Sequence, residues 1–334
     1  MADPAARPVV RTPAKVRHLT AEELRYDFTP PEPLPPDAEA SVPPALELEQ
    51  LDEDDPVLET VRDLLTTYGG VIFTGPPGTS KSWYAARIGA TLVAGDASRL
   101  RLVQFHPSYQ YEDFMEGYVP NDKGDGFTLE DKHFVDLAHK AGKRKDEWFV
   151  LVIDELSRGD PGRVFGEALT YIEKTKRDMP FKLASGNECI VPPNLLILAT
   201  MNPLDRGVDE VDAALERRFA KYAMEPDANI LASLLAAAGM DDVVEARVLA
   251  FFTWANRTAQ TNPHAALGHT YFTGVGDARS LRRLWEHQLR FHFDKAYRLD
   301  REGLREVYQR WDRVLGVMPT AETAEPEAEA EEEP

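Results

Sequence analysis

The sequence predicts an α/β fold: a parallel sheet with covering helices, followed by an α-helical domain and flanked by disordered tails. Three observations lead to this prediction. Short β-rich runs alternate with longer helical stretches between residues 57 and 225. Residues 226–318 have helical periodicity only. Proline and acidic residues dominate residues 1–56 and 319–334. Alternation of strands and helices is typical of parallel sheets, whose strands are joined by crossover helices.

The elements are predicted in order along the chain. Apolar runs bounded by glycine, proline or charge predict strands at 69–75, 101–105, 147–155, 194–203 and 218–226. Apolar residues three and four apart predict helices at 80–95, 131–143, 161–175, 227–239, 241–261, 278–293 and 301–315. The run EWFVLVIDE at 147–155 has six consecutive apolar residues, which is typical of a central strand covered on both faces.

The two tails hold most of the formal charge of -19. Residues 1–56 carry 13 acidic and 5 basic side chains and 11 of the 25 prolines, while residues 319–334 carry seven glutamates and no base. Segments of this composition bury too little apolar surface to offset the entropy of ordering, so we expect them to be disordered. The intervening part is nearly balanced in charge. It offers no broad basic face, and we expect DNA to be contacted only indirectly.

Composition also bears on location and metal content. No apolar run approaches the eighteen or so residues that a membrane span needs, so we expect a cytoplasmic protein with no membrane partner. A single cysteine, Cys189, excludes an internal disulfide and fits a reducing compartment. No His and Cys residues have zinc-ligand spacing.

The stretch FTGPPGTSKSW at 73–83 is almost a phosphate-binding loop, but Ser80 stands where the pattern G-x-x-x-x-G-K-[ST] has its last glycine. A strand precedes it and a helix follows, as the motif requires. Backbone N–H groups would surround the phosphates, Lys81 would reach the β- and γ-phosphates, and Ser82 would bind Mg²⁺. A small residue with helical φ and ψ should be tolerated at position 80. The alternative is a simple Gly/Pro turn. The predicted nucleotide-binding residues of this stretch are Gly75, Pro76, Pro77, Gly78, Thr79, Ser80, Lys81, Ser82 and Trp83.

Polar residues also follow two other predicted strands. Asp154 and Glu155 end the strand at 147–155, and Asn202 lies at the end of the strand at 194–203. The carboxyl ends of parallel strands line the ligand crevice of such sheets. There Asp154 would hold Mg²⁺ through water, Glu155 would polarise the attacking water, and Asn202 would orient it. The alternatives are an ordinary acidic pair and an Asn-Pro turn.

Three arginines complete the predicted site. Arg217 and Arg218 precede the last strand, where an arginine contributed to a neighbouring subunit could neutralise transition-state charge. Arg279 opens a helix of the C-terminal domain and could touch the γ-phosphate. Each has a simpler interpretation as a surface arginine, either at a helix C-terminus or on an amphipathic helix.

The order of these motifs resembles an AAA+ ATPase and, more narrowly, the McrB family, the NTPase motor of modification-dependent restriction systems. Besides the loop, the similar segments are FHPSYQYEDFMEGY (105–118), IDELSRGDPGRVFGEALTYIE (153–173), VPPNLLILATMNPLDRGVDEVDAALERRF (191–219) and GHTYF (268–272). The resemblance implies an AAA+ P-loop core at 57–225, an α-helical lid at 226–318, a leader at 1–56 and a tail at 319–334. In the well-known restriction proteins a folded DNA-reading domain precedes the motor. Here a leader that we expect to be disordered occupies that position, so we do not expect recognition of methylated DNA.

The resemblance also implies roles for individual residues. Lys81, Ser82, Asp154 and Glu155 would form the nucleotide and magnesium site. Asn202 would be the first sensor, with Asp205 and Arg206 completing the motif M-N-x-x-D-R. Arg217 and Arg218 would act in trans, which implies a homo-oligomeric ring, in this family a hexamer, and Arg279 would be the second sensor.

The sequence therefore predicts a Mg²⁺-dependent NTP hydrolase that works as a ring-forming motor for a partner effector. That partner would be an McrC-like nuclease subunit or another protein of a restriction or antiphage defence system. Base rates for the superfamily favour ATP, with GTP as the alternative. Two other functions remain open: a MoxR-like chaperone that remodels protein clients, and a nucleotide-dependent switch or scaffold with slow turnover.

Overall fold

The computed structural model describes residues 9–12, 15–18, 49–121, 125–204, 215 and 217–316. The chain divides into two compact units, residues 1–46 and 47–334. In the first, β1 (Val9–Thr12) and β2 (Lys15–His18) pair antiparallel, within the leader that the sequence predicts to be disordered. Valines in both strands favour extended pairing. The remaining leader residues up to 48 and the acidic tail lie outside the described residues.

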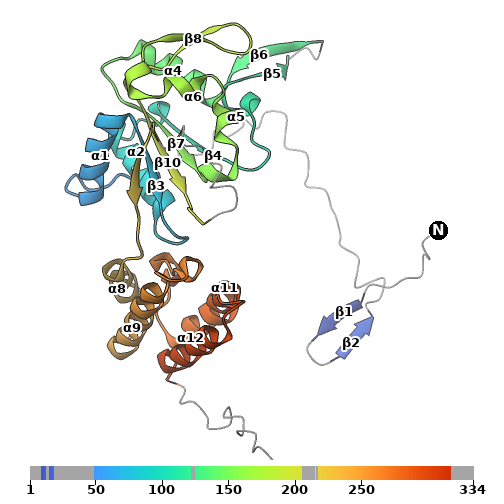
Figure 1. Ribbon diagram of the computed structural model, residues 1–334, viewed down its shortest axis with the longest axis vertical. Helices are drawn as coiled ribbons and strands as arrows, with labels where there is room; N and C mark the ends of the chain where they lie inside the picture. Colours follow the sequence, from blue (N-terminus) through green and yellow to red (C-terminus); the bar gives the residue numbers. More distant parts are fainter. Residues whose placement is uncertain are drawn as a thin grey trace, which may run out of the picture. The chain divides into compact units, whose positions relative to one another are not determined.

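The second unit is built on a five-stranded parallel sheet, as the sequence predicts (Figure 1). Its strands are β3 (Gly70–Thr74), β4 (Leu100–Gln104), β7 (Phe149–Asp154), β10 (Leu195–Met201) and β11 (Ala220–Ala223), in the order β11-β3-β10-β7-β4. Met201 of β10 lies opposite Thr74 of β3, and Ala199 lies opposite Ile153 of β7. The carboxyl ends of the three central strands therefore meet at one edge.

Helices cover both faces of this sheet, because its central strands are apolar on both sides. On one face, Leu58 of α1 (Pro56–Tyr68) and Ile88 of α2 (Lys81–Leu92) share a buried core with Phe73. On the other, Phe134 of α4 (His133–Lys143) packs with Ile72 in a second core. Asp55 caps the first turn of α1 by accepting hydrogen bonds from the N–H groups of residues 57 and 58. Residues 49–55, which the sequence assigns to the leader, are therefore part of the described unit.

One predicted helix is interrupted. The sequence predicts a single helix over 161–175, but the structure has α5 (Pro161–Phe165) and α6 (Ala168–Tyr171), separated at Gly166. Gly166 has φ of 49°, and a Cβ there would lie 2.8 Å from the ring of Tyr111. The close approach of Tyr111, which precedes α5 by fifty residues, makes this break a tertiary effect that local periodicity cannot reveal.

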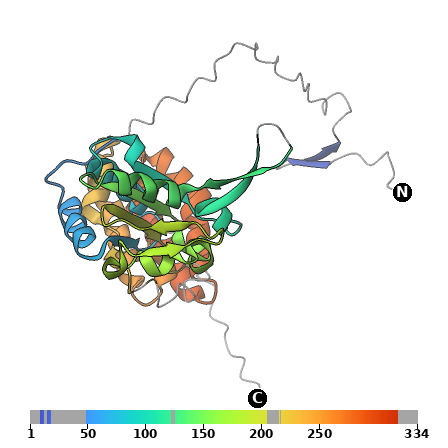
Figure 2. The ribbon, with the colours of Figure 1, turned by 90° about the horizontal axis from the view of Figure 1, so that it is seen from above.

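Two β-hairpins are inserted between the elements of the core, and the sequence pattern does not predict them. One pairs β5 (Glu116–Pro120) with β6 (Phe127–Asp131) after the short helix α3 (Tyr111–Phe114), and it projects from the sheet (Figure 2). The other pairs β8 (Pro180–Lys182) with β9 (Glu188–Ile190). Their strands have three to five residues, too few for periodicity to distinguish them from loops.

The C-terminal part is helical, which confirms the predicted architecture (Figure 1). It contains α8 (Ala228–Ala237), α9 (Asp242–Thr258), α10 (Ala278–Leu284), α11 (Arg290–Ala296) and α12 (Arg301–Val314). A π-helical turn, Trp285–Leu289, joins α10 to α11, so the single helix predicted at 278–293 is continuous but locally widened. Phe251, Phe293 and Trp311 lie in the core of this lid, which is separate from the two cores of the sheet.

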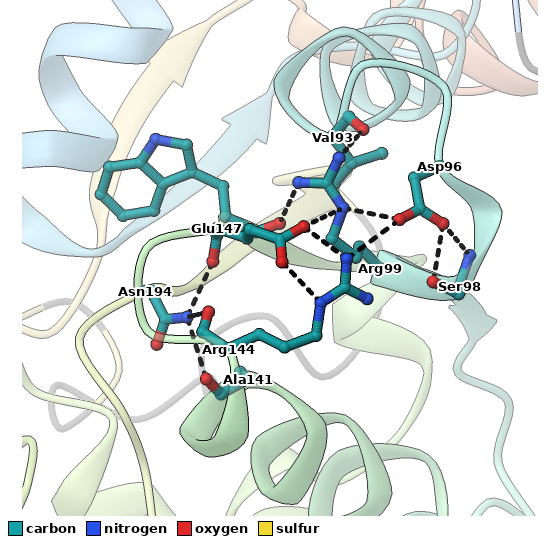
Figure 3. Close-up of polar contacts among 9 residues, drawn as sticks. Val93, Asp96, Ser98, Arg99, Ala141, Arg144, Glu147 and Asn194 are labelled. Atoms are coloured by element: carbon teal, nitrogen blue, oxygen red, sulfur yellow. Dashed lines mark hydrogen bonds and ion pairs between the residues drawn. The ribbon is translucent and has the colours of Figure 1, made fainter.

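A polar cluster closes the edge of the sheet at which β4, β7 and β10 begin (Figure 3). Arg99 Nε lies 2.9 Å from Asp96 Oδ2 and 3.5 Å from Glu147 Oε2, and Arg144 also pairs with both acids. The hydrogen bond from Ser98 and the guanidinium of Arg99 hold the pKa of Asp96 far below its usual range. The cluster ties the turn before β4 to the turn before β7 and lies at the opposite edge from the loop of residues 75–80.

Arg177 is buried at the same edge, where its guanidinium contacts backbone carbonyl groups. It is 7% exposed, and its guanidinium donates to the carbonyl oxygens of Gly69 (3.0 Å), Ile172 (3.1 Å), Pro192 (3.4 Å) and Leu195. Burial lowers the pKa of Arg177 to about 10, so the side chain stays charged at neutral pH. It connects the end of α1 to the start of β10.

We expect Arg177→Met to lower the free energy of unfolding by about 3 kcal/mol, because several buried carbonyl groups lose their donor. Urea denaturation measures this effect. Arg177→Lys should lie between Met and the parent, and Arg282→Met, on the exposed face of α10, should change stability by about 0.5 kcal/mol or less. Equal urea midpoints for Arg177→Met and the parent would contradict this role.

Candidate nucleotide-binding site

The loop between β3 and α2 has a closed geometry that its own residues set. Lys81 Nζ donates to the carbonyl oxygens of Gly75 (2.9 Å) and Pro76 (2.7 Å), and Thr79 Oγ1, which is buried, donates to Pro76 (3.0 Å). A Cβ on Gly75 would lie 2.2 Å from the carbonyl oxygen of Met224, so only glycine fits there. The lysine ammonium is thereby held at the centre of the loop, before the first turn of α2.

Ser80 does not have the conformation that the sequence analysis predicts. Its φ and ψ are 65° and 17°, in the left-handed region rather than the helical one. This conformation costs an L-residue about 1–2 kcal/mol, which explains why the loop pattern has glycine here. The Ser80 hydroxyl lies 2.8 Å from Nε2 of His269, a residue of the lid. The serine is therefore accommodated by a tertiary contact and not by helix geometry.

The structure brings together the predicted metal-binding residues. Ser82 Oγ donates to Asp154 Oδ1 at 2.6 Å, although the two residues are 72 positions apart. Both groups are oxygen donors, as Mg²⁺ prefers, and Mg²⁺ in phosphate sites takes only one or two protein ligands alongside phosphate and water. This donor set fits Mg²⁺. Within the described ranges there is no group of three or more His, Cys, Asp or Glu side chains that could hold a different kind of metal ion.

Glu155 has a left-handed backbone conformation, with φ of 55° and ψ of 46°. Non-glycine residues in this region store strain, and such residues cluster at functional sites. The Glu155 N–H donates to Thr200 Oγ1 at 3.0 Å, and its carboxylate pairs with Arg158 at 3.4 Å. The turn after β7 thus separates the two acids: Asp154 lies toward Ser82, and Glu155 lies in the wall of the cleft described below.

Thr200 is a functional candidate that the sequence analysis missed. Its hydroxyl donates to Asp154 Oδ1 at 2.6 Å and accepts from the Glu155 N–H, so one side chain positions both acids. It is 2% exposed near the carboxyl end of β10. The available signal was a hydroxyl residue within the otherwise apolar run LLILATM. A buried hydroxyl in such a strand requires a polar partner.

We expect Thr200→Val to lower kcat by about 10- to 100-fold, the usual effect of removing a group that orients metal ligands. Valine has the same shape, so the fold should persist. Thr200→Ser keeps the hydroxyl and is the matched control. Steady-state phosphate release and thermal unfolding should be measured on both variants. Full activity in Thr200→Val would show that the hydroxyl does not position the acids.

Of the remaining predicted site residues that the structure describes, only Asn202 lies at the cleft between the phosphate loop and the lid. Asn202 lies at the carboxyl end of β10, lines the cleft, and accepts the N–H of Leu204 through Oδ1 at 3.1 Å. Asp205 and Arg206 lie outside the described residues. Arg217 is exposed, whereas Arg218 is only 8% exposed. Neither arginine is among the described residues that line the cleft of its own chain.

A cleft of about 1380 Å³ runs between the phosphate loop and the lid. Residues Pro77–Trp83, Glu155, Thr200 and Asn202 form its core side. On the lid side, the cations that line it are Lys295 and Arg298, with His264 and His292 beside them. Arg279 is exposed in α10 and is not among the described lining residues, so its role as a second sensor stays a prediction. Sequence spacing did not identify Lys295 and Arg298, because only tertiary packing directs α11 and the turn after it toward the cleft.

None of the described helices has the length and apolar character to cross a membrane.

Comparison with known proteins agrees with this arrangement. A family model described as an AAA domain of the dynein-related subfamily matches residues 70–219. The chain is 37% identical over 177 residues to the Type IV methyl-directed restriction enzyme EcoKMcrB subunit of Escherichia coli (strain K12), covering 51% of this chain and 38% of that protein. It is 27% identical over 193 residues to the Type II restriction enzyme BsuMI component YdiS of Bacillus subtilis (strain 168), covering 46% of this chain and 56% of that protein.

The chain thus spans less than two thirds of the length of either relative. The matched range begins with β3 and ends directly before β11, so it includes the phosphate loop, both acids and Asn202. Residues 70–219 therefore match the AAA domain of the dynein-related subfamily and are similar in sequence to the McrB subunit of a restriction enzyme.

Proposed function

We propose that this chain is a Mg²⁺-dependent nucleoside triphosphatase that assembles into a ring and drives a partner effector. The observation that carries the proposal is the convergence of Ser82, Asp154 and Thr200 within hydrogen-bond distance, beside the lysine held in the phosphate loop. One helix and two strands, far apart in sequence, supply these groups. The sheet already has well-packed cores on both faces. The fold therefore does not need this set of polar contacts at its edge.

Each residue has a role that follows from its place. The loop N–H groups and Lys81 would bind the β- and γ-phosphates, as at other helix N-termini that bind phosphate. Ser82 and Asp154 would hold Mg²⁺, which supplies charge neutralisation of the phosphates when it is bound. Glu155 would take a proton from the attacking water, and Asn202 would orient that water. Thr200 fixes the relative positions of the two acids.

The ring is proposed from the position of Arg217. It is exposed and is not among the described residues that line the cleft of its own chain, so it is available to a neighbouring subunit. Relatives named as restriction-enzyme components support an effector of the same kind. We therefore propose an McrC-like nuclease subunit or a comparable defence protein as the partner, and ATP, with GTP as the alternative, as the substrate.

The proposal is tested by phosphate release and molecular mass, measured in the same samples with ATP, with GTP and with neither. We expect hydrolysis of one of the two nucleotides and a nucleotide-dependent increase in mass. Lys81→Ala should abolish hydrolysis, and Lys145→Ala, at an exposed turn, should not change it. Absence of hydrolysis of both nucleotides, with and without candidate partners, would refute the enzymatic function.

A further inference from the structure

His269 is a buried imidazole at the contact between lid and phosphate loop. It is 1% exposed and lies in the turn His269–Phe272 of the lid. Its Nδ1 accepts the backbone N–H of Asp227 (3.3 Å), and its Nε2 lies 2.8 Å from Ser80 Oγ. Because Nδ1 acts as an acceptor, the ring proton is assigned to Nε2, which donates to the serine. Burial lowers the pKa of His269, which keeps this neutral form at physiological pH.

The backbone around His269 touches the loop directly. The Thr270 N–H donates to the carbonyl oxygen of Gly78 at 3.0 Å. A Cβ on Gly268 would lie 2.2 Å from the carbonyl carbon and oxygen of Gly78. The lid segment 268–271 therefore packs against the loop at a distance that only glycine at 268 allows. The Thr270 amide is a natural reporter of whether this contact is closed.

Asp227, the third member of the cluster, lies where the core becomes the lid. It follows β11 by four residues and is the N-cap of α8, and its carboxylate accepts the N–H groups of Asn229 (2.6 Å) and Ile230 (3.2 Å). His269 thus joins three parts of the molecule: the phosphate loop through Ser80, the connection into the lid through Asp227, and the lid turn that carries it.

We infer that Ser80 and His269 form a link that couples the conformation of the phosphate loop to the position of the lid. In this account Ser80 is half of the link and not a neutral replacement for glycine, and His269 is a positioning residue. A glycine at 80 would have the same backbone conformation without strain but could not bond to the lid. The inference rests on the proposed function and deepens it, because a ligand that fixes the conformation of the phosphate loop would also affect the position of the lid.

Four variants of the full chain distinguish the hydrogen bond between His269 and Ser80 from the one between His269 and Asp227. Ser80→Ala and Ser80→Gly remove the serine hydroxyl, and glycine also relieves the left-handed strain. His269→Asn places an amide near the position of Nδ1, which keeps contact with Asp227 but does not reach Ser80. His269→Gln places an amide near Nε2 and restores the bond to Ser80. Ser233→Ala, which removes an exposed serine hydroxyl on α8, is the control.

Hydrogen exchange of the Thr270 amide, measured without nucleotide, tests the link. We expect exchange about fivefold faster in Ser80→Ala, Ser80→Gly and His269→Asn, equivalent to about 1 kcal/mol at 1.4 kcal/mol per tenfold. His269→Gln and Ser233→Ala should stay within about twofold of the parent. The double variant Ser80→Ala/His269→Asn should be no faster than either single variant, because both remove the same bond. Amides of β10 should be unchanged in all variants, which distinguishes loss of the link from general destabilisation.

Parental Thr270 exchange in Ser80→Gly and Ser80→Ala would overturn the inference, and so would additive effects in the double variant. This readout does not depend on hydrolysis. If the parent releases no phosphate but the exchange pattern is as expected, the proposed function fails and the link stands. If hydrolysis is present but exchange does not respond to these variants, the link fails alone.

Discussion

Glu155→Gln is expected to lower the rate of phosphate release by about 10²- to 10⁴-fold, the usual contribution of a general base, while nucleotide binding persists. Glutamine is nearly isosteric but cannot take a proton from water. The hydrogen bond to the Thr200 hydroxyl uses the backbone N–H of residue 155 and should survive, so the turn after β7 should keep its shape. The Lys81 and Ser82 contacts that would bind phosphate and Mg²⁺ do not involve this side chain.

Two measurements check this result: single-turnover phosphate release, and equilibrium binding of a fluorescent nucleotide. Glu188→Gln, which alters an exposed carboxylate on β9, is the matched control and should behave like the parent. A parental rate in Glu155→Gln would show that another group activates the water. Loss of binding together with turnover would show that Glu155 holds the nucleotide and does not act as the base.

Arg217→Ala is expected to lower turnover by about 10³-fold or more, the effect of removing an arginine supplied across a subunit boundary. The side chain is exposed, so the variant should fold normally. Arg218→Ala should differ in kind. Arg218 is 8% exposed, and truncating it should lower stability as well as activity. Phosphate release and thermal unfolding of the two variants distinguish these effects.

Mixing the Glu155→Gln and Arg217→Ala variants tests whether Arg217 acts on a neighbouring subunit. A subunit with Glu155→Gln keeps Arg217, and a subunit with Arg217→Ala keeps Glu155. Mixed rings should therefore contain some complete sites and recover part of the activity that both pure variants lack. Arg282→Ala mixed with Glu155→Gln is the control for dilution effects. No recovery on mixing, with mixed assembly shown by mass, would mean that Arg217 does not act on a neighbour.

The sequence was sufficient to predict the strands of the core sheet, because buried parallel strands are continuous apolar runs such as EWFVLVIDE. It also predicted that Ser82 and Asp154 would meet, because Asp154 ends one strand and Ser82 opens the helix that follows the loop after another. Both inferences depend on local pattern combined with one rule of sheet topology. No knowledge of long-range packing was needed for either.

What the sequence did not reveal depends on tertiary contacts. The left-handed conformation of Ser80 is stabilised by a histidine 189 residues away, and the break at Gly166 is required by Tyr111. Thr200 has a role only because its strand lies beside β7. Lys295 reaches the cleft through the fold of the lid. None of these relations has a signature within a window of ten or twenty residues.

An experimental structure with Mg²⁺ and a slowly hydrolysed triphosphate tests the central claim most directly. It should place the β- and γ-phosphates against Lys81, Mg²⁺ on Ser82 and beside Asp154, and Glu155 and Asn202 around the space beyond the γ-phosphate. A triphosphate bound elsewhere, or bound here with Asp154 and Glu155 turned away from it, would contradict the account.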